Sequence, residues 1–143
     1  MKRKASAHWA GGLKDGKGTV STESGILEKT QYSFGTRFED GKGTNPEELI
    51  AAAHAGCFSM ALSNILGEAG LKADSIDTEA TLTFEKTDAG FTVTEIHLDL
   101  KAAIPGSDEA KFMECAEKAK VGCPISRLLN TKITLTAKLV ATV

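Results

Sequence analysis

The chain has 143 residues, of which 41% are hydrophobic and 25% charged, as in an ordinary globular protein, and we expect one domain, 1–143. Its net charge of −2 provides no basic surface for nucleic acid and no broad attraction to anionic membranes. No apolar run follows the basic residues 2–4, so we expect no export signal. Three cysteines, an odd number, do not make a secreted disulfide framework. We therefore expect a cytoplasmic protein, because a cysteine pair in that reducing compartment is more often catalytic or metal-binding than structural.

Short strands are predicted at the start of the chain. Apolar residues alternate with polar ones over residues 5–9, and residues 19–22 follow a glycine-rich turn as the returning strand of a hairpin. The aromatic residues Tyr32, Phe34 and Phe38 indicate a third short strand.

The longest predicted helix begins at Pro46 and ends before Gly70. Asn45 can cap its first N–H groups, proline suits the first helical position, and glycine tolerates the left-handed conformation that ends helices. The helix is apolar nearly all round, which is typical of a buried helix. His54 and other polar residues interrupt it, so we do not expect a membrane span.

Alternating residues after this helix predict three more strands. Residues 80–85 and the segment after 91 flank a tight turn at 88–90. The apolar positions change parity near Thr94, as a β-bulge requires. The last strand is the clearest, with alternation over residues 133–143.

Two further helices complete the predicted fold. Ser107 can cap the first, Gly122 ends it, and the Cys123-Pro124 pair begins a short helical turn. We expect an α+β fold in which antiparallel sheets pack around the long buried helix. Two helices cannot fill the apolar faces of these sheets, so we expect a homodimer that completes the core.

Two cysteines are candidates for thiol chemistry. Cys123 lies at the cap of a short helix, where the helix dipole favours a thiolate. Cys57 lies in the middle of a helix and needs a nearby cation to ionise. These arguments rank Cys123 as the more acidic thiol. Cys115 lies beside Glu114 and Glu117 on a helix that looks exposed, and we expect no role for it.

Other chemistries leave weaker traces in the sequence. The histidines are scattered and no two cysteines are close, so we expect no metal site. The glycine-rich residues 11–18 are not followed by a helix, so they form no phosphate loop, and we expect no cofactor. His54 lies one helical turn before Cys57, which leaves a cysteine–histidine acyl hydrolase open. A non-enzymatic dimer that binds apolar ligands is also open.

Two cysteine motifs closely resemble those of the osmotically inducible protein C (OsmC) family, which is related to the organic hydroperoxide resistance proteins. The motifs are residues 43–62, around Cys57, and residues 119–126, around Cys123. The His8-Trp9 pair and residues 16–25 also look like the osmotically inducible branch. The resemblance covers essentially the whole chain.

The resemblance implies an OsmC-like fold and a cysteine-based peroxidase that reduces organic hydroperoxides to alcohols. It implies that Cys57 is the peroxidatic cysteine, which passes through a sulfenic acid, and that Cys123 is the resolving cysteine, which forms a disulfide with it. Glu47 matches the active-site glutamate of the family. Arg37 matches the arginine of the osmotically inducible branch, since the first hairpin here contains none.

The resemblance also implies partners. It implies an intimate homodimer with active sites at the subunit interface, and a thiol reductant such as a dihydrolipoyl group. Apolar walls would favour organic hydroperoxides over hydrogen peroxide. We expect four residues to supply them: Phe34, Phe38, Phe58 and Met60.

Overall fold

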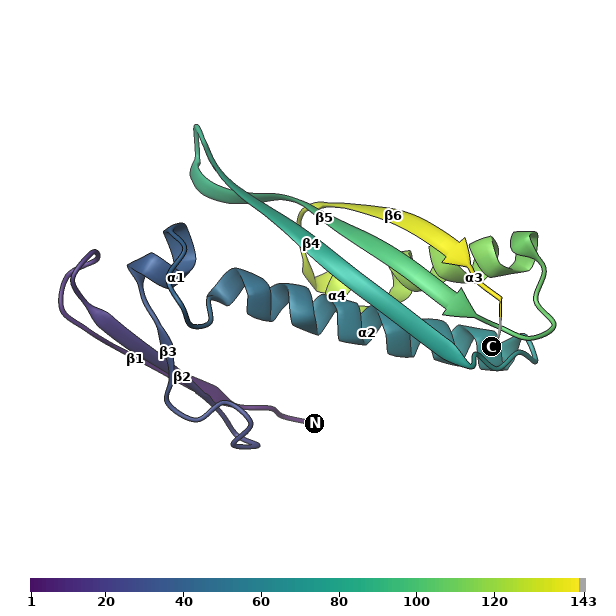
Figure 1. Ribbon diagram of the computed structural model, residues 1–143, viewed down its shortest axis with the longest axis horizontal. Coiled ribbons are helices and arrows are strands. Elements are labelled where there is room, and N and C mark those ends of the chain that lie inside the picture. Colours follow the sequence, from purple (N-terminus) through teal and green to yellow (C-terminus); the bar gives the residue numbers. More distant parts are fainter. Residues whose placement is uncertain (142–143) are drawn as a thin grey trace. The chain divides into compact units, whose positions relative to one another are not determined.

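The structure is a computed structural model that describes residues 1–141. It divides into two compact units, residues 1–49 and the chain from residue 50 onward, and each is described by itself. The elements in chain order are β1 (Ala5–Ala10), β2 (Lys17–Thr22), β3 (Thr30–Tyr32), α1 (Phe34–Phe38), α2 (Pro46–Glu68), β4 (Ser75–Thr87), β5 (Gly90–Ala103), α3 (Glu109–Gly122), α4 (Pro124–Leu128) and β6 (Lys132–Leu139) (Figure 1).

The first unit contains an antiparallel sheet with the strand order β1-β2-β3. Gly18 on β2 pairs with Trp9 on one side and Tyr32 on the other. The two rings close over this glycine, with their centroids 5.5 Å apart. A Cβ atom at Gly18 would lie 2.5 Å from the Trp9 ring and 2.6 Å from the Tyr32 ring, so the sequence needs a glycine there.

The third predicted strand is only partly correct, because it ends at Tyr32 and the chain then forms α1. Ser33 and Thr36 start this helix with a reciprocal cap: Ser33 Oγ accepts the Thr36 N–H, and Thr36 Oγ1 accepts the Ser33 N–H. Phe34 and Phe38, predicted as strand residues, therefore lie one helical turn apart, with ring centroids separated by 5.0 Å.

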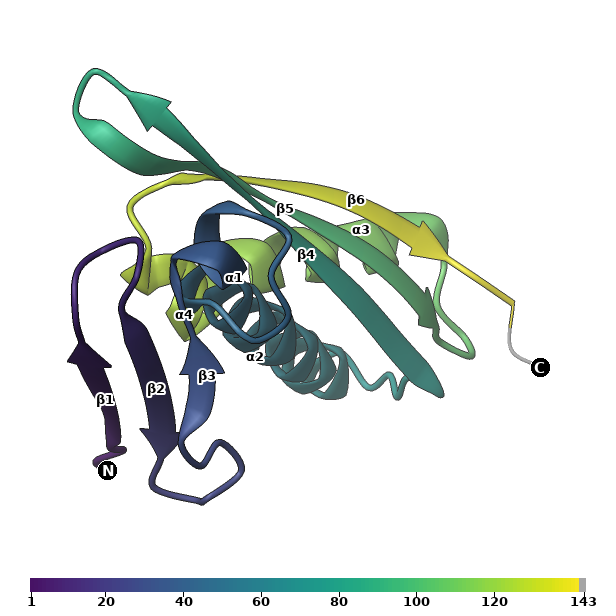
Figure 2. The same cartoon turned by 60° about the vertical axis from the view of Figure 1, so that its left-hand side comes forward.

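The second unit places α2 and α3 on one face of the sheet β4-β5-β6 (Figures 1 and 2). Its core combines Phe58, Leu62 and Leu66 of α2 with the inward residues of β5 and with Phe112 of α3. Cys115 of α3 also belongs to this core and is 2% exposed, so the expected exposed position for it is wrong. It lies on the buried face of α3, three residues after Phe112.

The strand pairing in the second unit confirms the bulge and corrects the predicted direction of one strand. Thr83 pairs with Glu95 and Phe84 with Val93, so Thr94 is the extra residue. β4 and β5 are antiparallel as predicted, but β5 and β6 are parallel. The reason is that α3 and α4 form a crossover that returns the chain to the same end of the sheet. The predicted last strand is also too long: β6 ends at Leu139, and residues 142–143 lie outside the described residues.

Helix α2 begins and ends where the sequence predicts. Asn45 Oδ1 accepts the Glu48 N–H at 2.8 Å, and Gly70 has a φ of +77° just beyond the helix. The prediction that α2 is buried on all sides is wrong for the single chain. Its buried residues are His54, Phe58, Leu62 and Leu66, which are spaced four residues apart on one face. Met60 on another face is 77% exposed. By length and composition alone α2 could cross a membrane, but the core helix of a soluble protein passes the same test. The α+β class is confirmed.

Candidate active site

The second unit brings two predicted site residues into contact. Cys57 lies in the middle of α2, Cys123 is the N-cap of α4, and their thiols are hydrogen-bonded to each other. Pro124 occupies the first position of α4, so the first free N–H groups of the helix follow it. Cys123 Sγ accepts the N–H of Ser126 at 3.4 Å. Cys123 is fully buried, whereas Cys57 is half-buried.

The two thiols have pKa values shifted in opposite directions. Burial, followed by the hydrogen bond with Cys123, raises the pKa of the Cys57 thiol. Burial also opposes ionisation of Cys123, but hydrogen bonds from Cys57 and from Ser126 outweigh it and lower the pKa of Cys123. Within this pair the negative charge therefore belongs on Cys123, as the helix-cap argument from the sequence predicts.

His54 makes its hydrogen bond with a serine. Its Nε2 lies 2.7 Å from Ser126 Oγ, and both residues are buried. Burial lowers the pKa of His54, so the ring is neutral near pH 7. Within residues 1–141, Nδ1 of His54 is a buried side-chain atom without a hydrogen-bond partner. The hydrolase alternative requires His54 to hold the Cys57 proton, and the observed hydrogen bond to Ser126 does not support it.

In the first unit, Arg37 and Glu47 form a bidentate ion pair. Arg37 Nε and Nη2 lie 2.9 and 2.8 Å from Glu47 Oε1, and Nε lies 3.3 Å from Oε2. The pair joins the last turn of α1 to the first turn of α2, where the helix dipole favours a carboxylate. The guanidinium also lies 5.3 Å from the centroid of the Phe38 ring.

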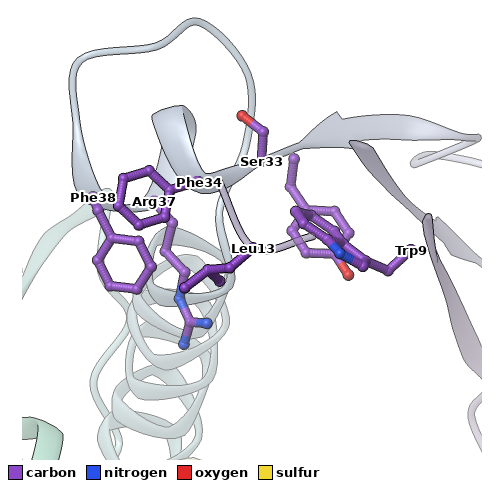
Figure 3. Close-up of a pocket in the computed structure, with 7 residues that line it drawn as sticks. Trp9, Leu13, Ser33, Phe34, Arg37 and Phe38 are labelled. Carbon is purple, nitrogen blue, oxygen red and sulfur yellow. The ribbon is translucent and has the colours of Figure 1, made fainter. Parts of the chain in front are cut away.

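A cavity of about 200 Å³ lies beside this arginine (Figure 3). Its lining includes Phe34 and Phe38, two of the four expected apolar walls. Phe58 cannot be a wall because it is fully buried in the core of the second unit, and Met60 lies on the exposed face of α2. The full lining is Trp9, Leu13, Tyr32, Ser33, Phe34, Arg37 and Phe38. The sequence predictions missed Trp9, Leu13 and Tyr32 as lining residues.

The four predicted site residues thus form two pairs: Cys57 with Cys123, and Arg37 with Glu47. In the part of the chain that the structure describes, no group of three or more His, Cys, Asp or Glu residues could hold a metal ion.

Comparisons with known proteins identify the family of the chain. The sequence profile described as OsmC-like protein matches residues 39–138. The chain is 58% identical over 133 residues to Peroxiredoxin OsmC of Escherichia coli K12, covering 93% of each chain. It is 31% identical to the organic hydroperoxide resistance protein OhrB of Bacillus subtilis, covering 77% of this chain and 79% of that protein. A crystal structure of an OsmC-like protein from Mycoplasma pneumoniae has the same fold, with a TM-score of 0.77 over 98% of both chains at 18% identity. The chain therefore belongs to the OsmC-like protein family.

Proposed function

We propose that this thiol-dependent peroxidase reduces organic hydroperoxides to alcohols, with Cys57 as the nucleophile and Cys123 as the resolving cysteine. The contact between the two thiols supports the proposal, because a hydrogen-bonded pair of sulfurs is already close enough for one to attack the other. The roles follow from access. Cys123 has no exposed surface, whereas Cys57 is partly exposed and can meet a substrate.

The reaction has three steps. The Cys57 thiolate attacks the terminal oxygen of the hydroperoxide, the O–O bond breaks, and the alkoxide leaves and takes a proton from water to become the alcohol. The sulfur of Cys123 then attacks Cys57 sulfenic acid; an S–S bond forms, the S–O bond breaks, and hydroxide leaves and is protonated to water. A dithiol reductant restores both thiols by exchange and is itself oxidised to a disulfide.

Arg37 is the proposed cation that ionises Cys57. Burial raises the pKa of the Cys57 thiol, so its thiolate needs a positive partner. Arg37 is suited to this role because Glu47 fixes the orientation of its guanidinium through a bidentate contact. Glu47 is thus the proposed positioning residue for the arginine.

The aromatic cavity supports an organic substrate. Phe34 and Phe38 surround the Arg37 side chain with apolar surface, which suits an alkyl or aryl group better than water. The name of the Bacillus subtilis relative, an organic hydroperoxide resistance protein, agrees with this substrate class. We propose a dithiol such as a dihydrolipoyl group as the reductant, and the cytoplasm as the location.

A homodimer completes the proposed enzyme. Met60 is 77% exposed on a face of α2 that also presents Ala53 and Gly56, and a second copy of the helix can cover such a face. Glu47 and Cys57 are ten residues apart on α2, about 15 Å along its axis. Antiparallel packing of two α2 helices would bring Glu47 of one copy towards Cys57 of the other, and the active site would be shared.

A single-turnover experiment tests the proposal. The reduced protein is mixed with one equivalent of an alkyl hydroperoxide, quenched rapidly, alkylated and digested. We expect one alcohol per chain and a disulfide-linked peptide pair containing Cys57 and Cys123. Recovery of both thiols unchanged, with the hydroperoxide intact, would rule out the peroxidase, and turnover of an activated ester under the same conditions would favour the hydrolase.

A further inference from the structure

A buried hydrogen bond joins two helices next to the thiol pair. His54 on α2 and Ser126 on α4 are 72 residues apart, and their side chains meet at 2.7 Å. His54 is fully buried and Ser126 is 6% exposed. Both are polar groups that could hydrogen-bond to water in the unfolded chain, so their burial is favourable only while the bond is made. The chemical steps proposed above use neither residue.

Ser126 also determines where the sulfur of Cys123 lies. Its N–H donates to Cys123 Sγ at 3.4 Å, and its hydroxyl is a further hydrogen-bond partner of that thiol. Helix α4 has only five residues, so it is too short to be stable without contacts to the rest of the unit. A shift of Ser126 would therefore carry Cys123 with it.

His54 fixes Ser126 from the opposite helix. It lies one turn before Cys57 on α2, so the same rigid helix carries the peroxide-reactive thiol and the anchor for the resolving one. The connection runs from Cys57 along α2 to His54, across to Ser126, and back through the Ser126 N–H to Cys123. Every link within it is either helical backbone or a hydrogen bond between buried groups.

We propose that His54 and Ser126 are positioning residues for the resolving step, which hold Cys123 Sγ in line with Cys57 Sγ so that the disulfide forms faster than the sulfenic acid is oxidised further. This inference rests on the proposed function. The two residues touch no substrate. They act by keeping two sulfurs at contact distance, and a misplacement of about 1 Å in such an arrangement can cost on the order of a hundredfold in rate.

The test separates the two chemical steps in Ser126→Ala. Alkyl hydroperoxide consumption in a single turnover reports the first step, and trapping of the sulfenic acid with a dimedone-type reagent against time reports the second. We expect the first step to stay within about twofold of the wild type. We expect disulfide formation to slow by at least about tenfold, so that trapped Cys57 sulfenic acid accumulates.

Two further variants exclude a general loss of structure. Ser126→Thr keeps the hydroxyl and should restore rapid resolution. Ser59→Ala removes another hydroxyl from the same unit, one that bonds Thr78 on β4, and should leave both steps unchanged. If Ser126→Ala fails to fold, His54→Gln takes its place and should show the same accumulation of sulfenic acid.

The outcomes distinguish the two proposals. Resolution at the wild-type rate in Ser126→Ala, or equal slowing in Ser59→Ala, would overturn the positioning role while leaving the peroxidase intact. A wild-type protein that never forms the Cys57 sulfenic acid would overturn the proposed function, and the positioning role with it.

Discussion

Arg37 binds Glu47 through two guanidinium nitrogens that converge on one carboxylate oxygen, at 2.8 and 2.9 Å. The carboxylate side chain is only 13% exposed, and the arginine side chain is 38% exposed. Glu47 lies in the first turn of α2, where the unpaired N–H groups favour its charge. The bidentate contact therefore holds the arginine in one orientation.

Glu47→Gln should weaken this contact without changing the size of the side chain. The amide oxygen carries no charge, and the NH2 group that replaces Oε2 cannot accept a hydrogen bond from Arg37, so the hold on the guanidinium orientation weakens. We expect the rate of hydroperoxide reduction to fall by about tenfold or more, equivalent to one unit in the pKa of the attacking thiol. The pH profile of Cys57 alkylation should move to higher pH in parallel.

Glu48→Gln is the matched control for this change. Glu48 accepts a hydrogen bond from Thr44 and does not belong to the arginine pair. It should leave the alkylation profile in place. Equal effects of the two substitutions would show that helix charge, and not the ion pair, controls Cys57.

The thiol pair predicts two opposite titration shifts. Cys123→Ala removes a hydrogen bond and a charge that raise the pKa of Cys57, so that pKa should fall. Cys57→Ala removes a hydrogen bond that lowers the pKa of Cys123, so that pKa should rise. Thiolate absorbance in the ultraviolet, measured against pH, gives both values. Shifts of the same sign in the two variants would contradict the observed hydrogen bond.

Acid stability should depend on His54. Burial lowers the pKa of His54 from its ordinary value of 6.5. Below that value the unfolded chain takes up a proton that the folded chain excludes, so stability is lost as the pH falls. The free energy of unfolding should decrease by up to about 1.4 kcal/mol per pH unit from this group. Urea unfolding between about pH 7.5 and pH 5.5 measures the slope, which should be shallower in His54→Gln. An identical slope in the variant would assign the acid sensitivity to other groups.

The proposed dimer predicts the effect of a charge on the exposed face of α2. Met60→Asp should shift the protein to monomers, because an unpaired carboxylate would be buried between two helices. Light scattering after gel filtration gives the mass. Val121→Asp places the same charge at another exposed apolar residue, on α3, and should leave the mass unchanged. A dimeric Met60→Asp would exclude this face as the interface.

A mixing experiment tests whether the active site is shared between two chains. Cys57→Ser and Glu47→Gln are unfolded together and refolded as a mixture. In a shared site, each hybrid dimer contains one site with both native residues, so the peroxidase rate should exceed that of either parent. No recovery above the parents would place Glu47 and Cys57 of the same chain in one site.

Local sequence signals predicted much of this fold. Asn45 and Pro46 mark the start of α2 and Gly70 its end, because caps depend on a few adjacent residues. The parity change at Thr94 revealed a bulge, and Cys123-Pro124 revealed the short α4. These features need no knowledge of the tertiary structure.

The failures came from contacts between distant residues or from ambiguous short patterns. The parallel pairing of β6 depends on the crossover through α3 and α4, which periodicity cannot reveal. Glu114 and Glu117 made Cys115 look exposed, but Cys115 lies on the face of α3 that packs against the core. Phe34 and Phe38 match strand and helix patterns equally well, and the Ser33–Thr36 cap decided between them. The same limit applies to the site, because His54 and Ser126 are hydrogen-bonded although they are 72 residues apart in the sequence.

The parallel pairing of β6 has a consequence for the order of events during biosynthesis. Helix α4 is connected through a short segment to β6, the last strand of the chain, and β6 joins the sheet beside β5. While β6 is still inside the ribosomal tunnel, it cannot pair with β5, and α4 lacks its C-terminal anchor. We therefore expect a nascent chain to expose Cys57 without a partner sulfur in place. The proposed disulfide between Cys57 and Cys123 can therefore form only after β6 has emerged from the tunnel and joined the sheet.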